Sequence, residues 1–235
     1  FNTVNYFGNG YPATGTQSIT GVGFQPDLVW TKERSTTGYH HLLDSVRGST
    51  NALFSNGTNA EYSQPTCITS FDADGFSLGA DTTGDGVNRL YTTYSAAGNI
   101  AWNWKANGAG VSNTNGSITS TVSANVDAGF SIVSYTGNGT SGATVGHGLS
   151  KAPEIIHIRE RNNVDNWMCY NHTIGNTKYM HLNSTIGAGT YNVWNNTSPT
   201  TSVFSLANFG SVNTSSDTYI AYAFHSVEGY SKVGS

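Results

Sequence analysis

Hydrophobic positions along this chain alternate with polar ones in short runs, and glycine or asparagine residues separate the runs. The clearest of them occupy residues 27–31, 100–104, 130–135, 154–158 and 218–224. No window keeps apolar residues at the helical i, i+3, i+4, i+7 spacing over three turns. An Asp-Gly pair at 74–75 comes just before another short run and is typical of a hairpin turn. Many short strands with turn signals between them predict an all-β protein of the antiparallel β-sandwich type, jelly-roll or concanavalin-like.

The pattern occurs twice. A Tyr-x-Gly-Asn-Gly motif at 6–10 returns at 135–139, and the segment 21–34 matches 148–161, each with a proline before an apolar run and a closing Glu-Arg pair. Further matches follow in the same order, at 76–78 with 204–206 and at 99–102 with 219–222. A kept order with a slowly drifting offset is what duplication followed by loop insertions produces. The sequence therefore predicts two tandem, diverged sandwich modules, residues 1–128 and 129–228, which fold separately or share one core.

The end of the chain carries a related signal. Residues 229–233 are similar to 129–133, which begin the second copy. We expect residues 229–235 to start a further repeat, or to form a strand that closes a sheet begun by the first strand. Residues 107–126 are rich in Ser, Thr, Asn and Gly, but Ile118 and Val122 indicate a strand inside that stretch.

The composition favours an extracellular β protein and argues against nucleic-acid binding and membrane insertion. Charged residues make up 10% of the chain, aromatic residues 12%, and the net charge is −4. A neutral polar exterior with aromatic cores is typical of extracellular β proteins. The scattered lysines and arginines provide no basic patch for nucleic acid, and no apolar run has the length of a membrane helix, so we expect no membrane insertion. Cys67 and Cys169 lack metal-ligand spacing; they pair in a disulfide or, as we favour, stay buried and free.

Candidate reaction chemistry is sparse. His40, His41 and Asp44 lie close together, but adjacent residues of a strand point to opposite faces, which favours a polar loop entering a strand. The aspartates Asp72, Asp74, Asp81 and Asp85 resemble an incomplete calcium loop and are better explained by Asp-Gly turns. Glu33 and Glu160 are repeat equivalents, so we interpret them as solvated strand ends rather than as a glycosidase pair. We expect no catalytic residues, no metal and no cofactor.

Aromatic rings are the remaining candidates, because flat rings stack on sugars. Trp102 and Trp104 share one strand face, but their counterparts Tyr222 and Phe224 are also large rings, which favours packing in a core. Trp167 and Trp194 lie among Asn and Thr residues, where we expect exposure. The candidate ligand-binding residues are Trp167, Trp194, Tyr191, Trp102 and Trp104.

Several of these segments together resemble a known repeat domain. They are the runs at 23–34, 43–48, 100–105, 129–139 and 219–232, and the domain, of uncharacterised function, occurs in virion, tail and tail-fibre-like proteins of marine phages, including phages of cyanobacteria. The second copy departs from it, since residues 166–172 replace the Asp-Ser-Val-Arg-Gly segment that ends at Gly48. The resemblance carries no catalytic or binding residues with it.

The resemblance implies a place on the virion, outside the cell. We therefore expect a non-catalytic structural module of a tail fibre, appendage or decoration protein. Its expected partners are other virion proteins or copies of itself, in a homo-oligomer or array, and a host-surface glycan. Two alternatives stay open: a carbohydrate-binding module of a bacterial surface or secreted protein, and a laminarinase-like glycan hydrolase.

Overall fold

The regular structure of the protein is almost wholly antiparallel β. The computed structural model describes residues 1–10, 15–34, 37–80, 87–88 and 98–234. These residues contain one short helix, α1 (Gly210–Asn213), and all other elements in them are strands. The all-β prediction is confirmed. None of the helical residues in the described ranges belongs to a segment long and apolar enough to cross a membrane.

The chain forms two compact units. The first unit comprises Phe1–Asn56 and Glu61–Lys105, and the second comprises Gly57–Ala60 and Ala106–Ser235. The short piece 57–60 belongs to the second unit because the buried Arg159 guanidinium donates hydrogen bonds to the carbonyl oxygens of Thr58 (2.6 Å) and Asn59 (2.8 Å). The compact units and the sequence repeat, with its boundary after residue 128, thus divide the chain at different residues.

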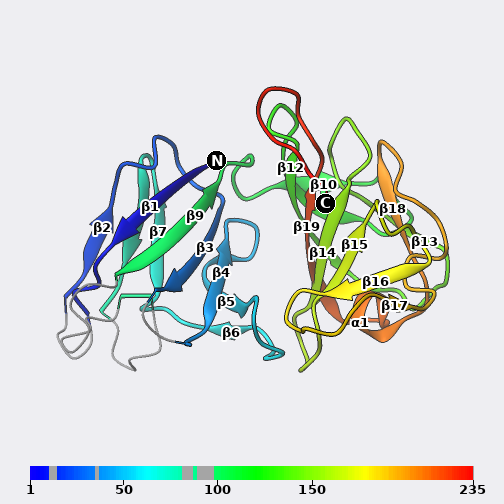
Figure 1. The fold of residues 1–235 in the computed structure, drawn as a ribbon, viewed down its shortest axis with the longest axis horizontal. Coiled ribbons are helices and arrows are strands. Elements are labelled where there is room, and N and C mark those ends of the chain that lie inside the picture. The colour runs from blue at the N-terminus through cyan, green and yellow to red at the C-terminus, as the bar shows by residue number, and fades with distance from the viewer. Residues whose placement is uncertain (11–14, 35–36, 81–86, 89–97, 235) are drawn as a thin grey trace. The chain divides into compact units, whose positions relative to one another are not determined.

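The first unit consists of a six-stranded and a three-stranded sheet (Figure 1). In spatial order the larger sheet contains β1 (Asn2–Tyr6), β9 (Asn99–Trp104), β3 (Leu28–Glu33), β4 (His40–Asp44), β5 (Gly48–Phe54) and β6 (Tyr62–Ser63). The smaller sheet contains β2 (Gln17–Ile19), β8 (Gly75–Leu78) and β7 (Ile68–Asp72). Residues of both sheets, among them Val29, Ala101, Ile68 and Phe76, form one core. The period of two in the sequence places Val29 in this core and the neighbouring Trp30 on the opposite face.

The second unit has an eight-stranded and a two-stranded sheet. The larger sheet contains, in spatial order, β10 (Val111–Asn113), β11 (Ser120–Asn125), β12 (Phe130–Thr136), β19 (Thr218–Phe224), β14 (Ile155–Glu160), β15 (Met168–Asn171), β16 (Lys178–His181) and β17 (Gly189–Thr190). The smaller contains β13 (Ala143–Gly146) and β18 (Val203–Leu206). Val145, Ile156, Ile158 and Phe204 belong to its core. Strands β10 and β11 fall within the stretch 107–126, as expected, whereas residues 229–234 form no named strand.

The two units repeat one strand order. Strands β1, β9, β3, β4, β5 and β6 correspond in sequence to β12, β19, β14, β15, β16 and β17, which are neighbours in the same order. The pairing registers agree as well: Leu28 lies opposite Asp44, and Ile155 lies opposite Asn171, each residue 127 positions after its counterpart. A shared order and register support the hypothesis of two diverged copies.

A tyrosine hydroxyl makes the same long-range contact in each unit. Tyr6 Oη donates to the carbonyl oxygen of Val87 (2.9 Å), and Tyr135 Oη donates to that of Val212 (2.8 Å). Both tyrosines begin the Tyr-x-Gly-Asn-Gly motif. The motif therefore ends a strand and, at the same time, fixes a second segment of chain beside it.

The residue after each valine is a fully buried asparagine, Asn88 or Asn213. Its Oδ1 accepts the backbone N–H of the motif asparagine, Asn9 at 3.0 Å or Asn138 at 2.9 Å. Its Nδ2 donates to backbone carbonyl oxygens in both units. We call residues 87–88 and 212–213 the Val-Asn pairs. In each unit the pair connects the Gly-Asn-Gly turn to the segments that flank the strands of the smaller sheet.

Candidate functional site

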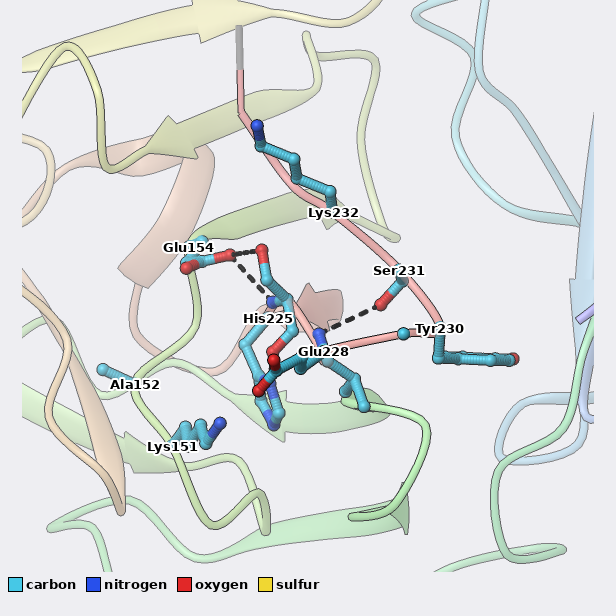
Figure 2. A pocket seen from close by; sticks show the side chains of 11 residues that line it. Lys151, Ala152, Glu154, His225, Glu228, Tyr230, Ser231 and Lys232 are labelled. Atoms are coloured by element: carbon cyan, nitrogen blue, oxygen red, sulfur yellow. Dashed lines mark hydrogen bonds between the residues drawn. The ribbon is translucent and has the colours of Figure 1, made fainter.

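A hollow of about 680 Å³ lies beside the end of β19 in the second unit. Two segments form its wall: residues 151–154, just before β14, and residues 225–232, just after β19. Glu154 N donates to Phe224 O at 2.7 Å, so the two segments leave the sheet side by side. The charged residues Lys151, Glu154, Glu228 and Lys232 line the hollow (Figure 2).

The second segment turns back sharply after β19. Val227 N and Ser231 O are 3.0 Å apart, and Gly229 within this turn has a φ of +74°, a conformation that glycine adopts without a steric penalty. Ser231 Oγ also faces Val227 N. In Figure 2 the Tyr230 ring, 52% exposed, points away from Glu154.

Glu154 is held as a fixed, ionised acceptor. One of its oxygens, Oε2, accepts hydrogen bonds from Ser226 N (2.8 Å) and Ser226 Oγ (2.5 Å). Burial alone raises the pKa of this carboxyl, but the two bonds from Ser226 and the nearby His172 and His225 outweigh it, and the pKa of Glu154 is lowered. The carboxylate is therefore charged at neutral pH, and Oε1 has lone pairs for a ligand hydroxyl.

His225 lies beneath the same wall and is 4% exposed. Its Nδ1 is 2.9 Å from the carbonyl oxygen of Ser226, so Nδ1 carries a proton and donates to that oxygen. Its Nε2 is buried without a hydrogen-bond partner among the described residues. A buried polar nitrogen of this kind costs free energy, but because it is buried it is not presented to the hollow, where Glu154 is the acceptor with a fixed position.

Over residues 1–235 the sequence matches a family model described as a domain of unknown function, DUF7483. This chain belongs to that family. Searches of curated proteins and of solved structures found no match.

The sequence did not predict the hollow at Glu154. A usable signal was present, since an acidic residue directly follows the repeated proline in both copies, Asp27 after Pro26 and Glu154 after Pro153. An acidic side chain kept at the start of a central strand is a feature that strand propensity alone does not require.

The expected exposure of two tryptophans is wrong. Trp167 is 0% exposed and Trp194 is 1% exposed. Trp194 belongs to the core of the second unit, where its Nε1 donates to Lys178 O at 2.9 Å. Trp167 stacks on Tyr222 with ring centroids 6.1 Å apart, and Asn183 Oδ1 accepts its backbone N–H. The polar side chains around these tryptophans form hydrogen bonds with backbone groups, as Asn183 does, and the indole rings themselves are buried in the protein interior.

None of the other aromatic candidates lines the hollow. Trp102 and Trp104 are half-buried on the face of the first unit's larger sheet that is opposite its core, so the favoured core packing is wrong for them. There they contact Trp30, with centroids 6.0 Å and 6.4 Å from it. Tyr191 is 57% exposed and touches Phe209. The structure does not bring the five predicted residues into one site.

A cysteine–histidine pair in the second unit is buried and uncharged at neutral pH. Cys169 Sγ lies 3.0 Å from His157 Nδ1, and neither Cys169 nor Cys67 is in a disulfide. Burial raises the pKa of the Cys169 thiol to about 12 and lowers the pKa of His157 to about 4. Both groups are therefore neutral at physiological pH, whereas a nucleophilic cysteine needs the thiolate.

The remaining polar candidates have structural contacts. His41 is buried against the Phe54 ring, and Asp44 is fully buried in an ion pair with Arg47. Asp74 accepts the N–H groups of Gly21 and Gly23, so it connects the β7–β8 turn to the segment that follows β2. Asp81 and Asp85 lie outside the described residues.

The Glu-Arg strand end is solvated in only one copy. Glu33 is partly exposed, but Glu160 is 5% exposed, and its burial raises the pKa of its carboxyl. The expectation is thus wrong for Glu160. Within the described ranges no three His, Cys, Asp or Glu side chains form a group that would hold a metal ion.

Proposed function

We propose that this chain is a non-catalytic structural module of a phage particle, of tail-fibre, appendage or decoration type, and that its second unit contacts host-surface glycans through the hollow at Glu154. The placement on a virion rests on the resemblance of the repeat motifs to virion proteins of marine phages. The observation that carries the glycan contact is the Glu154 carboxylate, which Ser226 holds in place on the wall of a hollow that Lys151 and Lys232 also line.

Glycan hydroxyls fit these groups. A hydroxyl donates to a carboxylate or an imidazole nitrogen and accepts from an ammonium group. Glu154 and Glu228 offer acceptors, and Lys151 and Lys232 offer donors around the same hollow. The charges of two lysines and two glutamates balance, which favours a neutral, hydroxyl-rich ligand over a strongly charged one.

A glycan hydrolase is the second candidate, because two carboxylates, Glu154 and Glu228, line the hollow. A glycosidase pairs a base or nucleophile with a general acid, whose pKa is raised so that it stays protonated near neutral pH. Since the pKa of Glu154 is lowered, this residue does not serve as the acid. That disfavours hydrolysis with Glu154 as proton donor.

Glycan binding is tested by titrating the chain with oligosaccharides from host surfaces on an array and then by calorimetry. Glu154→Gln keeps the shape and removes the charge, and we expect at least about tenfold weaker binding, since hydrogen bonds to charged groups contribute about 1.5–3 kcal/mol. Glu33→Gln, on the other unit, is the matched control and should bind like the wild type. Equal binding by all three proteins would contradict a site at Glu154.

Two further readouts separate the alternatives. Release of reducing sugar by the wild type, lost in Glu228→Gln, would overturn the non-catalytic proposal in favour of a hydrolase. Immunogold labelling of particles tests the virion placement; label on bacterial surfaces alone would instead indicate a carbohydrate-binding module of a cell-surface protein.

A further inference from the structure

A cluster of aromatic rings lies on the first unit where β4 begins, β5 ends and β6 begins. Phe54, the last residue of β5, is 3% exposed and contacts the rings of Tyr39, His41 and Tyr62. The rings of Tyr39 and Phe54 are stacked, with centroids 4.2 Å apart and planes 20° apart. The Tyr62 ring lies 5.8 Å from Phe54 on another side. We call Tyr39, Phe54 and Tyr62 the tyrosine platform.

Both tyrosines of the platform are half-exposed, Tyr39 at 44% and Tyr62 at 43%. Because a stack on Phe54 covers one face of the Tyr39 ring, the exposed part of that residue comprises the other face and the edge. Apolar ring surface in water is unfavourable, and a ligand that covers it gains the corresponding free energy. The platform therefore presents a flat apolar face with hydroxyl groups at its rim.

The side chain of Asn56 fixes the backbone on both sides of Tyr39. Asn56 Oδ1 accepts the N–H of His40 at 2.9 Å, and Asn56 Nδ2 donates to the carbonyl oxygen of Gly38 at 3.3 Å. The ring of Tyr39 is thus held from the backbone by these bonds and from the side by its stack. A ring that is already in place loses little conformational entropy when a ligand binds.

The charge next to Tyr62 is compensated. Glu61 precedes Tyr62, and Glu61 Oε2 lies 2.7 Å from Arg47 Nη1 in an ion pair. The Gln64 amide contacts the Tyr62 hydroxyl, so an uncharged group fixes that ring as well. A neutral surface of rings, hydroxyls and amides favours a neutral, hydroxyl-bearing ligand over an ion.

The second copy forms the equivalent hairpin without the stack. Its residues at the positions of Tyr39 and Phe54, 127 places later in the chain, are Asn166 and His181. Strands β15 and β16 nevertheless pair in the register of β4 and β5. The hairpin does not require stacked rings, so the fold alone does not account for a half-exposed stack in the first unit.

Tyr62 has a structural role in addition. It lies opposite Ala52 in the β5–β6 pair, and the equivalent pair of the second unit has Tyr179 opposite Gly189. Each unit thus places one tyrosine ring in this pair, on one strand or on the other. The stack is therefore the part of the platform that has no counterpart, and Tyr39 is the residue to test.

We propose that the tyrosine platform binds a neutral glycan, with the apolar face of one sugar ring stacked on Tyr39 and sugar hydroxyls bonded to the hydroxyls of Tyr39 and Tyr62. Tyrosine suits this role because one side chain supplies both an apolar face and a polar group. Binding sites for small ligands combine aromatic side chains with a few fixed polar groups in this way. The site belongs to the first unit and does not depend on the hollow at Glu154.

The test follows the tyrosine ring signals of the intact, isotope-labelled chain by NMR. Neutral hexasaccharides of glucose, galactose and mannose are added separately at millimolar concentration. The ring signals of Tyr39 and Tyr62 should move with at least one of them, and those of Tyr191, an exposed tyrosine of the second unit, should not. No movement with any of the three sugars, or equal movement at Tyr191, would overturn the proposal.

Three variants sharpen the assignment. Tyr39→Asn introduces the residue type of the second copy and should weaken binding about tenfold, because the stacking contact is lost. Tyr39→Phe keeps the ring and should bind within about threefold of the wild type, the effect of losing one hydrogen bond. Tyr191→Asn is the matched control and should bind like the wild type. Thermal denaturation checks that each variant is folded, and wild-type binding by folded Tyr39→Asn would contradict the proposal.

The same titrations separate this site from the hollow. Binding that Tyr39→Asn weakens and Glu154→Gln leaves unchanged belongs to the platform, and the reverse result belongs to the hollow, so each proposal fails without the other. Tyr39 ring signals that move with protein concentration in the absence of sugar, and stay fixed when sugar is added, would indicate a contact between copies of the chain. The platform would then not be a glycan site.

Discussion

The equivalent hairpins of the two units, β4–β5 and β15–β16, contain different side-chain networks at their turns. In the first, the β4–β5 turn encloses a buried ion pair, with Arg47 Nε 2.6 Å from Asp44 Oδ2 and Arg47 Nη1 2.7 Å from Glu61. In the second, Asn171 takes the place of Asp44 and accepts from the N–H and hydroxyl of Thr173, at 2.9 Å and 2.8 Å. One turn geometry is therefore compatible with a charged or a neutral side-chain network, and the units should respond differently to substitution and to acid.

Acid gives the largest expected difference. Burial lowers the pKa of His147 and of His157, both in the second unit, to about 4 from 6.5. A histidine whose pKa falls on folding stabilises the fold fully above its unfolded pKa and loses that contribution as pH drops toward the folded value. Each contributes about 3 kcal/mol between about pH 6.5 and about pH 4. Hydrogen exchange at about pH 5 should show the second unit opening first.

The matched variant is His157→Phe, which removes one titrating ring and should shift the acid transition of the second unit downward. If the first unit opens at the same or a higher pH than the second, the comparison fails.

Arg47→Met should give the next largest effect. It leaves the Asp44 carboxylate fully buried without its cation, and breaking a buried pair in this way costs about 4 kcal/mol. Urea denaturation measures the loss. The double variant Asp44→Asn with Arg47→Met imitates the neutral network of the second unit and should recover part of it; a double variant less stable than Arg47→Met would contradict that reasoning.

The Val-Asn pairs predict an equal response in the two units. Asn88→Ala and Asn213→Ala each leave buried backbone groups without partners, which costs about 3 kcal/mol. Unit-resolved hydrogen exchange should place the loss in the first unit for Asn88 and in the second for Asn213. Unequal losses, differing by more than about 1.5 kcal/mol, would show that the two contacts are not equivalent.

The smallest expected loss of stability is at two glycines in equivalent positions of the repeat, Gly21 and Gly148. Both residues have positive φ, +88° at Gly21 and +72° at Gly148, so an alanine costs about 1 kcal/mol at either. Gly148→Ala adds the contact with Val122 and should lose about 1–2 kcal/mol more, as overpacking does. Melting temperatures of the two variants measure the difference. Equal losses would show that no overpacking occurs at Gly148.

The strands were predictable because their signal is local. The run at 218–224 coincides with β19, and the Asp-Gly pair at 74–75 turns the chain between β7 and β8. Strand order was hidden, since it depends on contacts between distant segments. The Val-Asn pairs show this well: Tyr6 and Val87 are 81 residues apart, and a Val-Asn dipeptide has no local pattern of its own.

The candidate site was less predictable for a related reason. The exposure of an indole ring depends on which core the surrounding loop folds over, and Trp194 reaches Lys178 O, 16 residues away, to bury its ring. Glu154 and His225 meet only because β14 and β19 are neighbours in the sheet. Composition indicated a polar, weakly charged exterior, but not which end of a sheet would be hollowed.

In the second unit, the Val-Asn pair is followed by a connection that is itself bonded to the turn. Residues 214–217 separate Asn213 from β19, and within them Ser216 N donates to Gly137 O at 3.0 Å while Gly137 N donates to Asp217 O at 2.9 Å. An inserted residue would break these backbone hydrogen bonds, so this connection is a poor place to graft a peptide for display.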